Sequence, residues 1–154
     1  MKKLTFFWLV ILMTMPVRAQ FALKGGISFN KNEISSYVLT GQYYQDLLIV
    51  SGDLFIPTQK YEKVSGGARI GLGLGNYLLR FGGDMGAKYE SNHWRIGYGV
   101  EGNLRLYRQI GVFVRWAKTY PIYNKCGHNV VFWRRGRSEF FVGVVIDLSI
   151  KKCY

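Results

Sequence analysis

The feature that most constrains the fold is a strict two-residue alternation across residues 93–120. From Trp94 to Leu106 every second residue is apolar or glycine, and the residues between them are charged, polar or small. The same alternation restarts at Ile110, after the three residues Tyr107-Arg108-Gln109. Successive side chains of a β-strand point to opposite faces, and a helix cannot sort residues in this way. The segment is therefore predicted to be a long antiparallel hairpin with one apolar face and one polar face.

The alternation recurs along the chain in eight segments. The expected strands are Phe21–Asn30, Ser36–Tyr44, Asp46–Ile56, Val64–Leu74, Asn76–Tyr89, the two strands of the opening hairpin, and Glu139–Ile150. An apolar outer face, a polar inner face and an even number of strands, of which eight is the smallest, are typical of bacterial transmembrane barrels. The pattern therefore predicts an all-β, eight-stranded antiparallel transmembrane up-and-down β-barrel.

The connections between these segments are expected to alternate in length. The connections Gln45-Asp46, Gly75-Asn76 and Arg108-Gln109 are short, whereas Lys31–Ser35, Pro57–Lys63, Glu90–Asn92 and Pro121–Ser138 are mostly longer. Outer-membrane barrels place short turns in the periplasm and long loops outside the cell. Aromatic residues near the segment ends, Tyr120 among them, are expected to form interfacial girdles.

Residues 1–19 have the pattern of a cleaved signal peptide, which leaves residues 20–154 as one barrel domain. Lys2 and Lys3 precede an apolar stretch, and small residues precede Gln20. Removal of the peptide lowers the net charge by three from +12, and the remaining charges alternate along strands. No direct nucleic-acid binding is therefore expected, and the predicted location is the outer membrane of a Gram-negative bacterium. The predicted topology places Cys126 and Cys153 on opposite sides of that membrane, unpaired with each other.

Twelve charged residues are predicted to face the lumen. The basic ones are Lys24, Arg69, Arg80, Lys88, Arg95, Arg105 and Arg115, and the acidic ones are Asp53, Asp84, Glu101, Glu139 and Asp147. The interior of an eight-stranded barrel is only wide enough for side chains to fill it. Because isolated buried charges are very costly, these residues should pair with one another. We expect a structural ion-pair network, with a proton or ion path as the functional alternative.

An enzyme has to be considered, because small eight-stranded barrels include lipid A deacylases and acyltransferases. The nearest set of nucleophile, base and carboxylate is Ser138, His128 and Glu139. The deacylase family carries a serine two residues after its histidine, where this chain has Val130, and His128 is expected in an irregular loop. We therefore expect no catalytic residue, no metal site and no cofactor.

The longest predicted outer connection contains the densest basic cluster of the mature chain. The candidate binding residues in and beside it are Tyr123, His128, Trp133, Arg134, Arg135 and Arg137. Arginine binds phosphate groups in a bidentate manner. Outer-membrane lipid and lipopolysaccharide are the expected partners of this cluster, with a partner-protein or DNA contact as the alternative.

The mature chain resembles small barrels of the OmpA and OmpX kind in architecture. A narrower resemblance covers about a quarter of the chain. Residues 83–90, Trp94 and residues 97–104, with the hairpin that follows, are similar to the TraO family of conjugative-transposon transfer proteins. This resemblance implies an accessory component of a conjugal DNA-transfer apparatus, with protein partners in that complex. The alternatives are a stand-alone envelope, adhesion or lipopolysaccharide-binding barrel and, third, a lipid A-modifying enzyme.

Overall fold

The computed structural model describes residues 19–30, 33–60, 62–75, 78–125 and 128–148. Their elements are β1 (Ala19–Asn30), β2 (Glu33–Gln45), β3 (Leu48–Pro57), β4 (Ser65–Gly75), β5 (Leu79–Glu90), β6 (His93–Tyr107), β7 (Ile110–Lys125), β8 (His128–Val131), the 3-10 turn η1 (Trp133–Arg135) and β9 (Arg137–Asp147). Within these ranges no helix is long and apolar enough to cross a membrane. Of the predicted signal peptide, residues 1–19, only Ala19 lies within the described residues.

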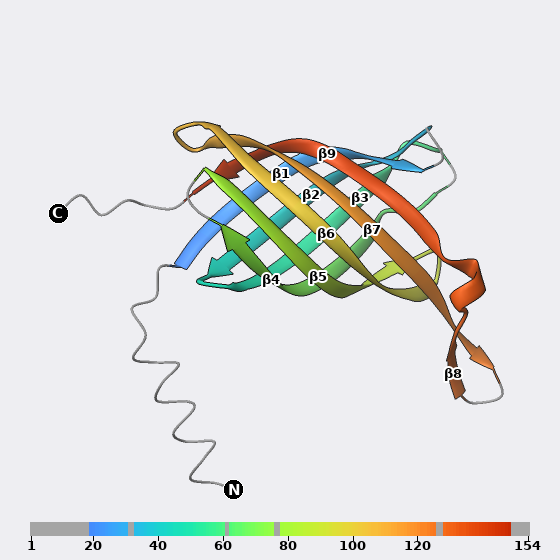
Figure 1. The fold of residues 1–154 in the computed structure, drawn as a ribbon. Helices are drawn as coiled ribbons and strands as arrows, with labels where there is room; N and C mark the ends of the chain where they lie inside the picture. Colours follow the sequence, from blue (N-terminus) through green and yellow to red (C-terminus); the bar gives the residue numbers. More distant parts are fainter. Residues whose placement is uncertain (1–18, 31–32, 61, 76–77, 126–127, 149–154) are drawn as a thin grey trace, which may run out of the picture.

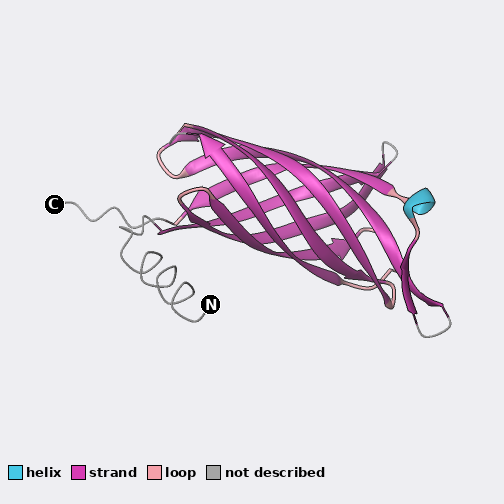
Figure 2. Cartoon of the chain, turned by 60° about the horizontal axis from the view of Figure 1, so that its bottom comes forward, coloured by secondary structure: helices cyan, strands magenta, loops and turns pink. Residues whose placement is uncertain are grey.

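Eight of the strands form one closed antiparallel sheet (Figures 1 and 2). Each strand from β1 to β7 pairs with the next, β9 pairs with both β7 and β1, and this second pairing closes the wall. The remaining strand, β8, pairs only with the end of β7. The predicted all-β, eight-stranded antiparallel barrel is thus confirmed. A closed wall leaves no unpaired sheet edge, which is the main structural advantage of a barrel.

The burial of side chains alternates along the wall as the sequence pattern predicts. In β3, Ile49, Ser51, Asp53 and Phe55 are buried, and the residues between them are exposed. The predicted outward residues are large and apolar, and they form the outer surface of the barrel, from Phe21 and Leu23 in β1 to Phe140, Val144 and Ile146 in β9. The polar residues that alternate with them point into the barrel, because the side-chain period of a strand is two.

The two ends of the barrel differ, and each is named here by its connections. The turn end holds the β2–β3, β4–β5 and β6–β7 connections, and the loop end holds the other connections together with β8 and η1. The first β-turn lies at Asp46-Leu47, one residue later than predicted, and Asp46 has a φ of 51°. At the loop end, the β5–β6 connection is only the two-residue turn Ser91-Asn92, with φ of 50° and 67°. These angles match the type I′ turn that joins twisted strands most readily.

The long connection expected over residues 121–138 is mostly ordered β-structure, which corrects the sequence analysis. Strand β7 continues to Lys125 and forms a hairpin with β8, and η1 then leads into β9. His128 begins a strand and does not lie in an irregular loop. Tyr120, expected on the outer rim, is only 7% exposed, because its ring packs against Trp133. Figure 1 shows the hairpin projecting beyond the wall.

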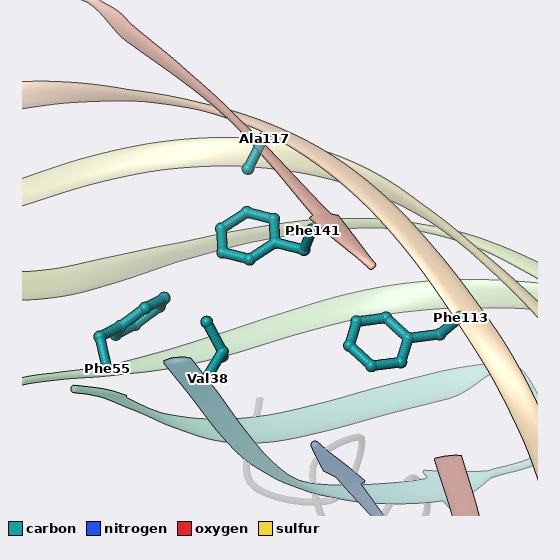
Figure 3. Close-up of a cluster of buried hydrophobic side chains, with 5 residues drawn as sticks. All are labelled: Val38, Phe55, Phe113, Ala117 and Phe141. Carbon is teal, nitrogen blue, oxygen red and sulfur yellow. The ribbon is translucent and has the colours of Figure 1, made fainter. Parts of the chain in front are cut away.

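The interior contains an apolar cluster that the sequence analysis did not anticipate. Val38, Phe55, Phe113, Ala117 and Phe141 are buried and gather inside the barrel (Figure 3). They come from β2, β3, β7 and β9, and the rings of Phe55 and Phe141 lie 6.2 Å apart. Each of them occupies an inward position on its strand, so the inner face is a mixture of charged and aromatic side chains.

Candidate functional site

The centre of the lumen is organised around Arg69 on β4. Its guanidinium donates to both carboxylate oxygens of Asp53, at 2.5 and 2.7 Å, and Nη1 donates to Asp84 Oδ2 at 2.9 Å. From the other side, Arg115 donates through Nη2 to Asp84 Oδ1 at 2.7 Å. Thr40 adds a hydroxyl donor to Asp53 at 2.6 Å. Two arginines and two carboxylates from β3, β4, β5 and β7 therefore form one connected chain of charge-assisted hydrogen bonds.

A second group surrounds Glu101 on β6. The amino group of Lys24 on β1 forms an ion pair with this carboxylate, and both side chains are almost completely buried. Asn103 donates to the same carboxylate oxygen at 2.9 Å, and Gln42 donates at 3.4 Å. Lys24 and Glu101 lie 77 residues apart in the sequence. This pair crosses the barrel and fixes the position of β1 relative to β6.

A third group lies toward the loop end. Lys88 forms ion pairs with Glu139 at 3.5 Å and with Glu90 at 3.1 Å. Arg137 lies 3.2 Å from Glu139, and Arg95 lies 3.8 Å from Glu90 while donating to the Thr119 hydroxyl at 3.1 Å. In this group the two carboxylates of Glu90 and Glu139 are shared among three cations, Lys88, Arg95 and Arg137.

Aromatic rings are interleaved with the buried cations. Lys88 Nζ lies 4.0 Å from the ring centre of Phe55, and Lys24 Nζ lies 5.1 Å from that of Phe113. The guanidinium of Arg115 is 5.1 Å from the ring centre of Phe141. Cation–π contacts of this kind are stronger where both groups are desolvated. The apolar cluster therefore supports the ion-pair network as well as filling space.

The middle of the lumen leaves little free volume. The space beside Asp53, Arg69, Lys88 and Glu139 amounts to about 30 Å³, enough for only a few water molecules. A larger chamber of about 310 Å³ lies at the turn end, beside Arg80 and Arg105. Arg105 forms an ion pair with Asp147 there. The interior is thus filled in its middle and open at one end, a geometry that does not favour a pore for solutes.

The candidate binding residues of the loop end separate into four places. Tyr123 stacks on His93 at 5.3 Å and contacts Phe132 edge-on at 5.3 Å. Trp133 is 64% exposed and rests on Tyr120 at 4.8 Å, while Arg134 and Arg135 follow it in η1 and are exposed.

Arg137 belongs instead to the lumen group, through its contacts with Glu139 and Glu90. His128 pairs with Lys125 through the backbone at the tip of the hairpin. The loop-end extension, defined here as residues 120–136, therefore presents Trp133, Arg134 and Arg135 together, and holds Tyr123 apart from them.

The three residues weighed for hydrolysis do not converge on one face. Ser138 and Glu139 are consecutive in β9, so their side chains point to opposite faces, Ser138 outward and Glu139 into the lumen. Glu139 is occupied by Lys88 and Arg137. Across the part of the chain that the structure describes, no three His, Cys, Asp or Glu side chains are grouped as metal ligands would be.

Sequence reasoning missed several members of the lumen groups. Glu90 was assigned to a connection, although it shares the inward face with Arg80, Asp84 and Lys88 at even spacing, and that spacing is the signal that could have found it. The sequence pattern predicts no specific partner for Thr40, Gln42 or Asn103. Thr40 donates to Asp53 directly opposite on β3, and Asn103 donates to Glu101 two residues earlier in β6, so both contacts are local in the sheet. Gln42 on β2 donates to Glu101 on β6, a contact across the lumen that no local pattern reveals.

Comparison with known proteins identifies the fold and no family. No family model matches the chain. No curated protein sequence matches it. Among solved structures, the chain is similar to a de novo designed protein, TMB2.3, with a TM-score of 0.51 and 13% identity over 86% of this chain and 94% of that one. It is also similar to Neisserial surface protein A, with a TM-score of 0.46 and 14% identity over 86% of this chain and 96% of that one. At this identity, the likeness to the designed protein concerns the fold alone.

Proposed function

We propose that this chain is a non-enzymatic integral β-barrel of the outer membrane of a Gram-negative bacterium. The observation that carries the proposal is the inversion of polarity across the wall. Leu72, Leu74, Phe81 and Met85 are 59–68% exposed on the outside, whereas Lys24 and Glu101 are buried inside. Soluble proteins rarely expose a continuous apolar surface of this extent. Lipid chains can cover such an apolar surface, and a closed sheet leaves no unpaired backbone edge in the hydrocarbon region.

Labelling of cysteine tests both the insertion and the orientation. Cys126 lies outside the described residues, but it follows β7 and precedes β8 at the loop end. An impermeant maleimide should label Cys126 on intact cells. Cys153 also lies outside the described residues and follows β9 in the sequence, and we expect it to be labelled only after the outer membrane is opened. The Cys126→Ser variant is the matched control for assigning the label. Labelling of Cys153 alone on intact cells would reverse the orientation, and recovery of the protein in the soluble fraction would contradict insertion.

The recognition element of this proposal is the loop-end extension. The middle of the lumen is filled, and the wall faces lipid in the proposed setting, so specific contacts outside the cell fall to this end. The extension is held in place by the β7–β8 pairing, by the Phe132 N–H donating to the Pro121 carbonyl at 3.0 Å, and by the Trp133–Tyr120 contact. Exposed aromatic and arginine side chains are the types enriched at binding hot spots.

The process served by this element is proposed to be conjugal DNA transfer, through protein partners of the transfer apparatus. The support is the resemblance of residues 83–90 and 97–104 to the TraO family. These residues form the paired segments of β5 and β6, in which Gly83 faces Val100 and Gly86 faces Gly97. The resemblance therefore falls on the wall and does not include the extension.

Deletion of the extension tests its role. Replacing residues 122–136 by a Gly-Asn turn joins β7 to β9 just beyond their last registered pair, Thr119 and Arg137. The barrel should fold, and transfer frequency from a donor strain should fall at least tenfold. The matched control shortens residues 59–63 at the same end of the barrel. A folded deletion protein with unchanged transfer would contradict the conjugation proposal.

A second candidate, lipopolysaccharide binding, is favoured by one observation. Arg134 and Arg135 are exposed beside Trp133, so a phosphate group and an apolar chain could be contacted at one place. In this case the double variant Arg134→Gln/Arg135→Gln should weaken binding of purified lipopolysaccharide and leave transfer unchanged. The opposite result, lost transfer with unchanged lipopolysaccharide binding, favours the protein partner.

A further inference from the structure

The chamber at the turn end is a structural feature that the loop-end extension does not explain. Its volume of about 310 Å³ lies at the lower limit of small-molecule sites. Its polar lining includes Gln20, Tyr44, Arg80, Asn103, Arg105 and Asp147. Toward the middle of the barrel it ends at the Lys24–Glu101 group, because Asn103 lines the chamber and also donates to Glu101. The chamber is therefore a blind recess and not one half of a channel.

Arg80 lines this recess and forms no ion pair with a carboxylate of the described residues. Among the described residues, no carboxylate lies within ion-pair distance of Arg80, whereas the neighbouring Arg105 is paired with Asp147. The guanidinium of Arg80 lies 4.3 Å from the ring centre of Tyr44. The Tyr44 hydroxyl donates to Gln42 at 2.6 Å, which holds the ring in place. A guanidinium packed on a fixed ring is pre-organised to present its donors to an oxyanion.

Asn103 supplies a second, independent observation. Its amide nitrogen is used by Glu101, but its oxygen, Oδ1, is buried and accepts no hydrogen bond within the described part of the chain. Asn103 lies directly opposite Arg80 in the β5–β6 register. A buried acceptor without a donor costs free energy, so a ligand that brings a donor to this position is favoured. The recess thus pairs an uncompensated cation with an unused acceptor.

We propose that this recess binds a phosphate group that carries a hydroxyl. The anionic oxygens accept hydrogen bonds from Arg80, and the P–OH donates to Asn103 Oδ1. Of the other charged groups at the recess, Asp147 is held by Arg105, and Asp46 is exposed at the rim. Inorganic phosphate carries this hydroxyl near neutral pH, and a soluble phosphate monoester or a lipid headgroup ending in a phosphate monoester carries it below a second pKa of about 6.

Comparison of phosphate with sulfate tests the proposal without any variant. Near neutral pH, sulfate has the size and charge of phosphate but no hydroxyl, so it cannot donate to Asn103. Calorimetric titration of the full-length barrel in a zwitterionic detergent at constant ionic strength should show saturable phosphate binding, at least tenfold tighter than sulfate binding. Equal affinities, or no saturable binding of phosphate, would overturn the proposal.

Two variants then distinguish the role of Arg80 from that of Asn103. Arg80→Gln should weaken phosphate and sulfate binding alike, at least tenfold, and Asn103→Ala should remove only the preference for phosphate. Lys63→Gln, an exposed basic residue at the loop end, is the matched control and should leave both affinities unchanged. Wild-type phosphate affinity in Arg80→Gln would overturn the assignment of the site.

Competition distinguishes the sources of the phosphate. At about pH 5.5, where a phosphate monoester keeps one P–OH, glycerol 3-phosphate should displace bound phosphate if the ligand is a soluble ester. Phosphatidic acid in phosphatidylcholine vesicles should displace it if the ligand is a lipid headgroup. Either result supports the phosphate site, and failure of both competitors would restrict it to the inorganic ion.

Discussion

At the residue scale, most of the buried carboxylates among the described residues are shared by more than one donor. Glu101 accepts from Lys24 and Asn103, and Asp53 accepts from Arg69 and Thr40. A buried ion pair is stable only when its remaining lone pairs are also satisfied, since desolvation of two charges costs several kcal/mol. The polar residues beside each pair are therefore as much a part of the network as the charges.

Removal of one partner from the Lys24–Glu101 pair should be strongly destabilising. Glu101→Gln keeps the shape but leaves Lys24 without its carboxylate, and we expect a loss of about 3–5 kcal/mol in the free energy of unfolding. The double variant Lys24→Met/Glu101→Gln should recover at least half of that loss. Denaturant titration in lipid vesicles, followed by tryptophan fluorescence, measures both. The exposed Glu33→Gln is the control, and an equal loss in the single and double variants would contradict a coupled pair.

Substitutions on the outer and inner faces of the wall should differ in their cost to the free energy of unfolding. Val100 is 56% exposed on the outside, and Val100→Arg should cost about 2–4 kcal/mol in lipid if it lies near the bilayer midplane. Ser51 is buried on the inside and its hydroxyl has no partner in the described residues, so Ser51→Ala should cost less than about 0.5 kcal/mol. The same vesicle assay reports both values. A neutral Val100→Arg would mean that this face does not meet lipid.

At the scale of elements, closure of the barrel depends on the β1–β9 pairing. Gly26 and Gly143 are directly opposite each other in that pairing and face the lumen. A Cβ atom on Gly143 would lie 2.2 Å from the Gly25 carbonyl oxygen and 2.8 Å from the ring of Phe113. The two glycines allow Phe113, a member of the apolar cluster, to lie close to the backbone of both strands. The strand pairing and the interior packing are therefore coupled at this position.

A methyl group at this position should weaken closure. Gly143→Ala is expected to cost about 1–3 kcal/mol, the usual range for overpacking, and to reduce the fraction of chains that fold into vesicles. Gly25→Ala is the matched control, because a Cβ there meets nothing within 4 Å on the outer face. The folded fraction can be read from the faster gel migration of unheated samples. Equal folding of the two variants would show that the β1–β9 pairing accommodates the added group.

At the scale of the whole molecule, the fold is a closed wall around a filled interior. Some of the ion pairs bridge strands that are not neighbours in the sheet, as Lys24 and Glu101 do between β1 and β6 and Lys88 and Glu139 do between β5 and β9. Such cross-lumen contacts resist flattening of the barrel, while the hydrogen-bonded wall resists local fraying. Together they favour an all-or-none loss of structure.

This architecture should give heat-modifiable migration in electrophoresis. The unheated protein is expected to migrate faster than the boiled protein, because a closed sheet stays compact in detergent below the temperature at which it unfolds. Circular dichroism of the unheated sample should be dominated by β-structure. A sample with identical migration before and after boiling, or with a mainly helical spectrum, would contradict the closed barrel.

The strands and the direction that each side chain faces were predictable from the sequence, because a period of two is a local property of the chain. Residues 93–107 show their two faces without reference to any other strand, and β6 has the predicted alternation of burial. The turn at Asp46 lies only one residue from its predicted position, because the position of a turn also depends mainly on the local sequence. The hairpin of β7 and β8 was missed, because residues 122–131 lack a clear alternation.

Only the tertiary structure decided which inward residues meet. The positions opposite one another across the lumen depend on the tilt and stagger of the strands, and no single strand encodes these quantities. The pairing of Lys24 with Glu101, the grouping of Phe55, Phe113 and Phe141, and the recess beside Arg80 all follow from that stagger. The sequence therefore determined which side chains are inside the barrel, and the closure of the sheet determined what each of them contacts.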